Sequence, residues 1–146
     1  METRGGFLIS QIKQIQGRIF EKLLSKSGID AFNGAQGRIL YVLWQKDELP
    51  IVELSRQTGL AKTTLTGMLD RLETQGLITR STDANDRRQI IIRLTDSARQ
   101  LSSDYQRVSD KMSAIFYRGF SDDAIIRFEK DLNAILKNLE ESEMQP

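Results

Sequence analysis

The chain of 146 residues contains no cysteine and no histidine. Without cysteine there is no disulfide, no thiol redox switch, no thiolate zinc site and no cysteine nucleophile. Without histidine the chain lacks the commonest metal ligand and the usual general base of enzymes. No EF-hand loop or paired DxD spacing offers a carboxylate metal site instead. The composition therefore predicts a protein that is not an enzyme and that holds no cofactor or metal.

Long apolar runs are missing as well. No run approaches the roughly 18–20 residues that cross a bilayer. Residues 1–6 lack the basic, apolar and small-residue segments of a signal peptide. Apolar residues make up 39% of the chain and charged residues 28%, which is typical of soluble globular proteins. We therefore expect a cytoplasmic protein with no membrane partner.

The net charge is only +1, but the charges are unevenly distributed. Residues 55–94 carry seven Lys/Arg against four Asp/Glu, whereas residues 95–146 carry seven against ten. The middle of the chain is therefore basic and its C-terminal part acidic. This asymmetry indicates a basic face on an otherwise neutral molecule.

Hydrophobic periodicity predicts helices in the first third of the chain. Apolar residues recur at three- and four-residue steps from about Phe7 to Lys26, which is typical of an amphipathic helix, and Gly28 is suited to end it. Asn33 is a good N-cap for a second helix that is apolar over most of its circumference. Gly34 and Gly37 weaken this helix locally and favour close contacts with its neighbours.

Two short helices are expected next. The first begins at Pro50, which suits a first helical turn, and ends at Gly59. The second begins after Ala61 and ends at Gly76. Two short helices joined through a glycine-containing turn are typical of a helix-turn-helix. The expected buried side of the second helix consists of Leu65, Met68, Leu69 and Leu72.

The periodicity then changes to that of strands. Leu77–Thr82 and Gln89–Leu94 favour β structure, and the polar loop 83–88 between them is rich in turn-forming residues. We expect a hairpin directly after the helix-turn-helix, with Ile90, Ile92 and Leu94 on one face. Such a hairpin is called a wing.

Two long helices are expected at the C-terminal end. Thr95 is suited to cap the first, and Ser121 or Asp122 the second. Their apolar stripes, like that of the first helix, exceed what a winged domain of about 55 residues covers, and apolar patches of that size are unusual on monomers.

Three motifs occur in order and at characteristic spacing. A D-R-L-E-x-x-G-L pattern lies at Asp70–Leu77, a D-x-x-D-x-R pattern places Asp83, Asp86 and Arg88, and an L-T pair ends the second strand at Leu94. Together they make the chain resemble the MarR (multiple antibiotic resistance regulator) family, whose length and element order it matches. The resemblance implies a mainly α fold with a small β-hairpin wing (α+β), flanked by long dimerisation helices.

The resemblance also implies an organisation and a function. Residues 1–146 would form a single MarR-type domain, with a winged helix-turn-helix lobe at 33–95 and a helical dimerisation region at 1–28 and 96–146. The protein would be a homodimeric transcription regulator that binds a palindromic double-stranded DNA operator, a repressor released by a small phenolic or other anionic effector. The alternative is a helical or winged protein-interaction adaptor without DNA binding.

The second short helix carries the expected DNA-reading residues. Its outward N-terminal surface is polar and, apart from Lys62, uncharged, which suits the roughly 12 Å wide major groove and its base edges. A plain solvated helix face is the alternative interpretation. The expected DNA-binding residues of this helix are Lys62, Thr63, Thr64, Thr66 and Arg71.

The wing carries the other expected contacts. Arg87 and Arg88 at the hairpin tip suit a narrow, electronegative minor groove. Either Asp83 or Asp86 is expected to hold one of these arginines in a fixed pose through a charge-assisted hydrogen bond. A plain solvated turn is the alternative.

Two positions depart from the family pattern. Ala61 stands where relatives commonly carry a serine N-cap, so a helix cap is missing. Gly67 stands where many carry arginine; a glycine inside a helix costs about 1 kcal/mol relative to alanine, and close approach to DNA would compensate for it.

The position of an effector pocket in the family points to four further residues. They lie where the dimerisation helices meet the winged lobe. The aromatic members of this set are equally suited to the hydrophobic core. The candidates are Arg18, Phe20, Tyr41 and Trp44.

Overall fold

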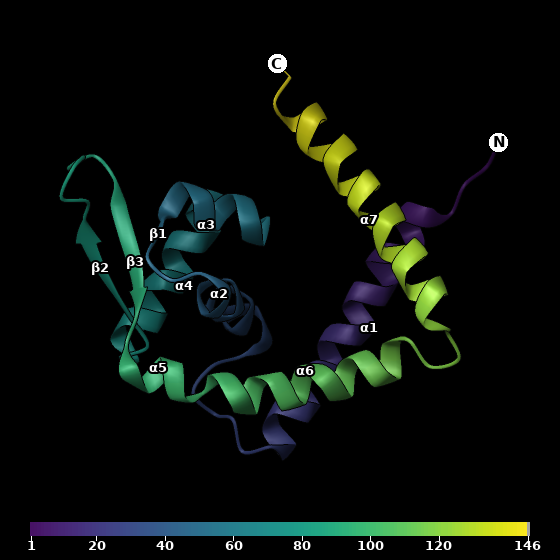
Figure 1. Cartoon of the computed structure of the whole chain (residues 1–146), viewed down its shortest axis with the longest axis horizontal. Helices are drawn as coiled ribbons and strands as arrows, with labels where there is room; N and C mark the ends of the chain where they lie inside the picture. Colours follow the sequence, from purple (N-terminus) through teal and green to yellow (C-terminus); the bar gives the residue numbers. More distant parts are fainter. Residues whose placement is uncertain (146) are drawn as a thin grey trace. The chain divides into compact units, whose positions relative to one another are not determined.

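The computed structural model describes residues 1–145 (Figure 1). These fall into two compact units, one of residues 1–112 and one that starts at Ser113. The fold is mainly helical with one small antiparallel sheet, as the sequence predicts. Its elements are α1 (Gly5–Lys26), α2 (Gly34–Gln45), β1 (Leu49–Pro50), α3 (Ile51–Thr58), α4 (Lys62–Thr74), β2 (Ile78–Thr82), β3 (Ile90–Leu94), α5 (Asp96–Gln100), α6 (Ser102–Phe116) and α7 (Asp122–Glu143).

The predicted signals at the end of α1 and at the start of α2 are confirmed. Gly28, with a φ of 74°, turns the chain away from α1. The Asn33 side chain accepts a hydrogen bond from the backbone N of Gln36 at 2.8 Å, and the Gln36 side chain accepts one from the backbone N of Asn33 at 3.1 Å. This reciprocal capping box satisfies two amides that have no partner within the helix.

Helix α2 is the centre of the hydrophobic core of the first unit. Ile39 and Leu40 are fully buried. A Cβ atom on Gly37 would lie only 2.7 Å from the Tyr105 ring and 3.1 Å from the Phe32 ring, so only glycine permits this approach. The close helix contacts predicted from Gly37 are confirmed.

Helices α3 and α4 form the predicted helix-turn-helix. Gly59, with a φ of 71°, makes the turn between them, and Gly76, with a φ of 76°, leads from α4 into β2. The N-cap Ala61 makes no side-chain hydrogen bond, which confirms the missing cap. The predicted buried side is also confirmed: Leu65, Leu69 and Leu72 are fully buried and Met68 is partly buried.

The hairpin and a third strand form one sheet in the order β1-β3-β2. Strand β1 was not predicted, because two residues that include a proline are too short to show alternation. Ile92 and Leu94 are buried as expected, but 43% of Ile90 is exposed. Ile90 pairs with Thr82 at the loop end of the hairpin, beyond the reach of the core.

The prediction of one long helix after Thr95 is wrong. Thr95 does cap a helix by accepting a hydrogen bond from the backbone N of Ala98, but this helix, α5, is short, and α6 begins only after Leu101. The backbone N of Leu101 donates to the carbonyl of Ala98, three residues back, so the chain tightens there. The Trp44 indole donates to the same carbonyl at 3.0 Å and holds α5 against α2.

The second unit contains the end of α6 and all of α7. Ser121 caps α7, as one of the two predicted alternatives, by accepting a hydrogen bond from Ala124 N at 3.2 Å. Tyr117 lies among Phe116, Phe120 and Phe128, and its hydroxyl donates to the Glu129 carboxylate at 2.6 Å.

No helix within residues 1–145 is long and apolar enough to cross a membrane. The three-residue clusters of Asp and Glu that a carboxylate metal site would need are also absent from this part of the chain.

Candidate nucleic-acid interface

Helix α4 presents one side to the core and the other to solvent. Because Leu65, Leu69 and Leu72 are fully buried, the residues between them point outward. All the expected major-groove residues lie on the exposed part of this helix, so the structure brings them together on one element; they are Lys62, Thr63, Thr64, Thr66 and Arg71.

One of the three threonines has part of its hydrogen-bonding capacity engaged. The Thr66 hydroxyl donates to the carbonyl of Lys62, one turn back, at 2.8 Å. Its oxygen can still accept a hydrogen bond, but its proton is used within the helix. Thr66 therefore differs from a freely rotating hydroxyl: it offers an acceptor and a methyl group.

Gly67 lies on the side of α4 opposite the buried leucines. A Cβ atom added there would meet no atom within 4 Å. In contrast to Gly37, the fold itself gives no steric reason for glycine at this position.

At the tip of the β2–β3 hairpin, the two aspartates have different roles. The carboxylate of Asp86 accepts hydrogen bonds from the backbone N of Arg88 at 3.0 Å and from its Nε at 3.1 Å. These bonds hold the pKa of Asp86 below its usual value. Asp83 instead accepts from the backbone N of Asn85 at 3.0 Å and shapes the turn. Of the two alternatives in the sequence, the geometry selects Asp86 as the residue that holds an arginine.

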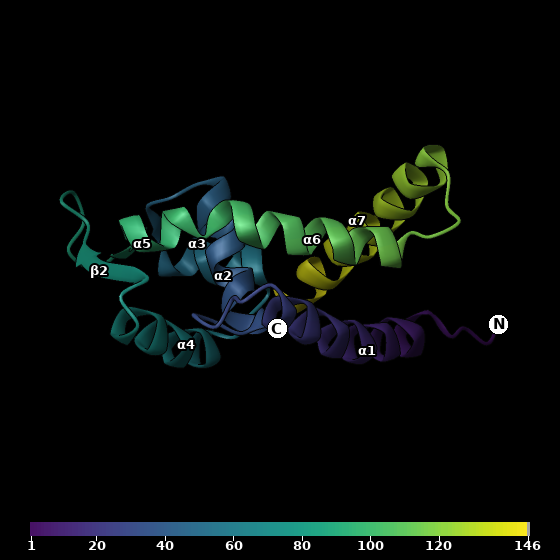
Figure 2. The ribbon, with the colours of Figure 1, turned by 90° about the horizontal axis from the view of Figure 1, so that it is seen from below.

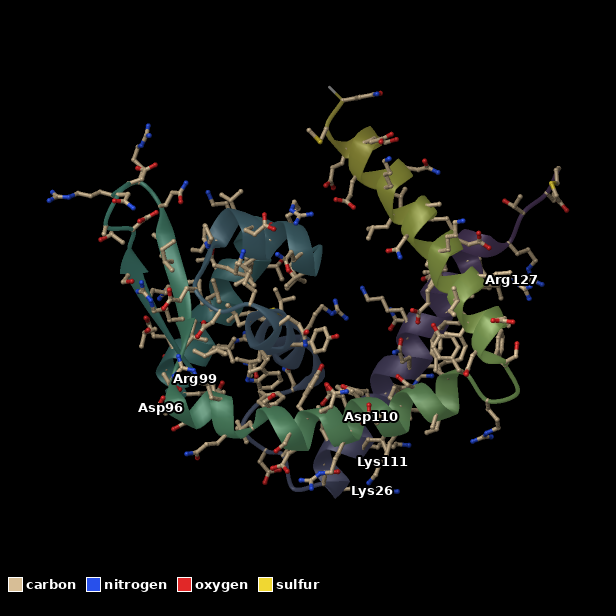
Figure 3. All side chains as sticks on the ribbon, viewed as in Figure 1. Lys26, Asp96, Arg99, Asp110, Lys111 and Arg127 are labelled. Carbon is tan, nitrogen blue, oxygen red and sulfur yellow. The ribbon has the colours of Figure 1, made fainter. Side chains whose placement is uncertain are left out.

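Nitrogen-bearing side chains extend from the hairpin tip into solvent (Figure 3). The side chain of Arg88 is 91% exposed even though it is paired with Asp86. Arg87 is exposed as well. The arginines at the tip are therefore accessible to a macromolecular partner.

An arginine outside the three sequence motifs connects α4 to the hairpin. Arg80 on β2 places Nη2 2.7 Å from Asp70 Oδ1 and 2.8 Å from Glu73 Oε1 (Figure 2 shows α4 beside β2). The hydrogen bonds that Arg80 donates lower the pKa of Glu73, and donation to Glu73 and Asp70 raises the pKa of Arg80. Glu73 and Arg80 are seven positions apart with the turn at Gly76 between them, so no helical or strand periodicity indicates the pairing.

The base of the hairpin is also held by polar contacts. Asp47, just beyond α2, accepts a hydrogen bond from the backbone N of Leu94 at 3.0 Å, and its other oxygen lies 3.1 Å from Arg99 Nη2. Arg99 also pairs with Asp96 at 2.7 Å; both lie on α5 (Figure 3). No sequence pattern indicates this cluster, because Asp47 lies about fifty residues from Leu94 and Arg99.

The expected effector residues lie around one buried ring. The rings of Phe20, Tyr41 and Trp44 have their centroids 5.6, 6.3 and 5.1 Å from that of Tyr105. Tyr105 is only 7% exposed, and Phe20 and Trp44 pack against the core, which favours the interpretation of these two as core residues; Tyr41, in contrast, is 43% exposed. Arg18 is exposed on α1.

A cavity of about 280 Å³ lies at the junction of α1, α2 and the end of α4. None of the four expected effector residues lines it. Two of its lining residues are acidic, and one of them, Glu21, accepts a hydrogen bond from the backbone N of Gly34 at 2.6 Å. The lining residues are Glu21, Leu24, Ser25, Ile29, Asp30, Phe32, Asn33, Gln36 and Gln75.

Most of the winged lobe matches a known protein family. Residues 32–90, which include α2, α3, α4 and the start of the hairpin, match the model of the MarR family. The chain is 33% identical over 96 residues to the organic hydroperoxide resistance transcriptional regulator of Bacillus subtilis (strain 168), which is 66% of this chain and 63% of that protein. Residues 32–90 of the chain therefore match the MarR family, and the structure as a whole is similar to that of a MarR protein.

Two further proteins are similar to the chain. The HTH-type transcriptional regulator TtmR of Methylorubrum extorquens (strain PA1) is 36% identical over 85 residues, 58% of this chain and 42% of that protein. Both curated relatives are thus covered over less than two thirds of their length. A crystal structure of a mutant MarR from E. coli complexed with operator DNA is similar with a TM-score of 0.78 at 26% identity, over 90% of this chain and 92% of that one.

Proposed function

We propose that the protein is a sequence-specific transcription regulator that binds double-stranded DNA. The observation that carries the proposal is that a polar, exposed face of α4 is followed directly by a hairpin whose tip presents Arg87 and Arg88, the latter held by Asp86. The similarity to an E. coli MarR in complex with operator DNA supports this assignment.

Each element has a distinct task in the proposed complex. Helix α4 enters the major groove, where threonine hydroxyls and methyl groups contact base edges. The hairpin places arginine at the adjacent minor groove, whose negative potential increases where it is narrow. Lys62 and Arg71 contribute positive charge near the phosphates. Residues 33–95 thus form the DNA-binding lobe in this proposal.

The proposed active form is a homodimer. The N-terminal half of α1 exposes 63% of Phe7 and 42% of Ile12, and α7 has no buried residue among those described. Such apolar surface is unusual on a monomer and is covered in a dimer. A two-fold dimer through residues 1–28 and 96–146 presents two α4 helices, so the operator is a palindrome.

Regulation by a small molecule completes the proposal. We assign the protein as a cytoplasmic repressor without catalytic activity, released from DNA by an effector. The cavity beside Glu21 and Asp30 contains carboxylates, which disfavour an anion, so a phenolic or other anionic effector is proposed for the surroundings of Arg18 and Tyr41 instead.

The test is selection of bound sequences from a random duplex pool by the purified protein. We expect enrichment of a palindrome with half-sites centred about 10 bp apart, one helical turn. The variant with Lys62, Arg87 and Arg88 all replaced by alanine serves as the control and should enrich nothing. Absence of any enriched duplex with the natural protein would contradict the proposal and favour an adaptor without DNA binding.

A further inference from the structure

Two carboxylates lie on α4 among the residues proposed to meet DNA. Asp70 follows Thr66 by one helical turn, and its side chain is 59% exposed; Glu73, one turn further, is 42% exposed. Negative charge close to the phosphate backbone opposes binding. If these two groups stood alone, they would offset the charges of Lys62 and Arg71 on the same helix.

They do not stand alone, because Arg80 reaches them from the neighbouring strand. One guanidinium contacts both carboxylates, with Nη2 at 2.7 and 2.8 Å and Nε donating to Glu73 Oε2 at 3.4 Å. Its side chain is 26% exposed, so it lies between the helix and the sheet rather than in open solvent. Opposite Arg80 in the sheet register is Ile92, which is fully buried.

The arrangement has a geometric and an electrostatic consequence. A planar guanidinium that binds two side chains fixes direction as well as distance, which an ammonium group does not. It therefore sets the orientation of α4 relative to β2, and hence relative to the hairpin tip. Its charge also offsets one of the two negative charges of the acidic pair on the exposed side of α4.

We propose that Arg80 is a positioning residue for DNA recognition, which aligns α4 with the wing and offsets half of the negative charge of Asp70 and Glu73 so that both elements bind one duplex. The inference rests on the proposed DNA binding. Arg80 itself need not touch DNA, since it acts through the two acidic side chains.

Three variants separate the two consequences, with duplex from the selection and a scrambled duplex as probes at several salt concentrations. Arg80→Gln removes the compensating charge and should weaken binding to both duplexes by roughly tenfold or more. Arg80→Lys keeps the charge but loses the planar guanidinium that binds both carboxylates. It should therefore retain affinity for scrambled duplex and lose affinity for the selected one. The triple variant Asp70→Asn, Glu73→Gln, Arg80→Gln should regain affinity for scrambled duplex only.

Arg107→Gln is the matched control, because it removes one arginine from a pair with Asp104 on α6, outside the winged lobe. It should bind like the natural protein, and thermal unfolding should show all variants folded. Binding by Arg80→Gln equal to that of the natural protein would overturn the inference while leaving the proposed function intact. So would a triple variant that stays weak on scrambled duplex. Failure of the natural protein to bind any duplex would instead overturn the proposed function, and the inference with it.

Discussion

The carboxylate of Asp86 holds the guanidinium of Arg88 in place at the hairpin tip, with Asp86 Oδ1 3.1 Å from Arg88 Nε. An exposed ion pair of this kind contributes little to stability. It does restrict the rotamers of a long side chain that is otherwise free in solvent. We therefore expect the ion pair to favour DNA binding, because the restricted Arg88 side chain loses less conformational entropy when it binds.

The first prediction concerns this pair. Arg87→Ala and Arg88→Ala should each weaken operator binding by about 1–3 kcal/mol and reduce the salt dependence by about one unit per lost contact. Asp86→Asn should weaken binding less than Arg88→Ala, because the charge remains and only its pose is lost. Fluorescence anisotropy across a salt series measures both quantities. If both arginine variants bind like the natural protein, the hairpin does not contact DNA.

The second prediction concerns base reading by α4. Replacing Thr63 or Thr64 by alanine should cost specific binding roughly 1–3 kcal/mol per good base contact, with scrambled duplex nearly unaffected because no formal charge is lost. Thr66→Val retains a methyl group and should lose less than Thr66→Ala, since the Thr66 proton is already donated to Lys62. Lys62→Ala should weaken both duplexes by similar factors. Competition assays at fixed salt give the ratios; equal losses on both duplexes would mean that the threonines only position the helix.

The third prediction concerns Gly67, whose replacement by alanine should raise the stability of the protein but lower its affinity for the operator. Gly67→Ala should raise the free energy of unfolding by up to about 1 kcal/mol, because alanine favours the helix and its Cβ meets no neighbour. Operator affinity should fall, since the new methyl group separates the helix from the groove. Gly17→Ala on α1, where a Cβ also meets nothing, controls for helix propensity alone. Unchanged operator affinity of Gly67→Ala would show that close approach to DNA does not explain this glycine.

The fourth prediction concerns assembly. Light scattering at micromolar concentration should give about twice the monomer mass of 16.7 kDa. Ile12→Glu on α1 and Leu139→Glu on α7 place a charge on exposed apolar surface and should shift the protein towards monomer. Val52→Glu, on exposed surface of α3, is the control and should leave the mass unchanged. A mass near that of one chain for the natural protein would contradict the dimer.

The fifth prediction concerns pH. Burial and the neighbouring Glu129 carboxylate raise the pKa of Tyr117 from 10 to about 12. Because the pKa is higher in the folded state, the folded protein holds the Tyr117 proton up to a higher pH than the unfolded chain. The contribution of Tyr117 to stability is therefore complete below pH 10 and is lost between about pH 10 and 12. Urea unfolding should show a steeper loss of stability over this range in the natural protein than in Tyr117→Phe. Parallel curves would show that Tyr117 does not titrate in this way.

Local signals were predictable from the sequence because they depend on neighbouring residues. Asn33 caps α2 through a residue three positions away, and Gly59 and Gly76 adopt the left-handed conformation that glycine favours. The same holds for the buried leucines of α4, whose spacing alone assigns their face. These features decide which elements form.

Contacts between elements were not predictable in this way. The pairs of Arg80 with Asp70 and of Asp47 with Arg99 require the fold to bring distant residues together. The division between α5 and α6 has the same origin, because the Ala98 carbonyl is bound by an indole 54 positions earlier in the chain. Three of the expected effector residues, Phe20, Tyr41 and Trp44, surround Tyr105, which no sequence pattern indicates.

The anchoring of the hairpin at one end alone has a mechanical consequence. Asp47 fixes the backbone at Leu94, where β3 ends, whereas the opposite end of the strand carries the exposed Ile90 and the loop beyond it. We therefore expect the hairpin to be rigid near Leu94 and flexible at the loop end. We expect the strand register to stay constant while the tip moves, so that in the proposed complex Arg88 follows grooves of different width without any rearrangement of the core. Amide hydrogen exchange should accordingly become faster from Leu94 towards Ile90.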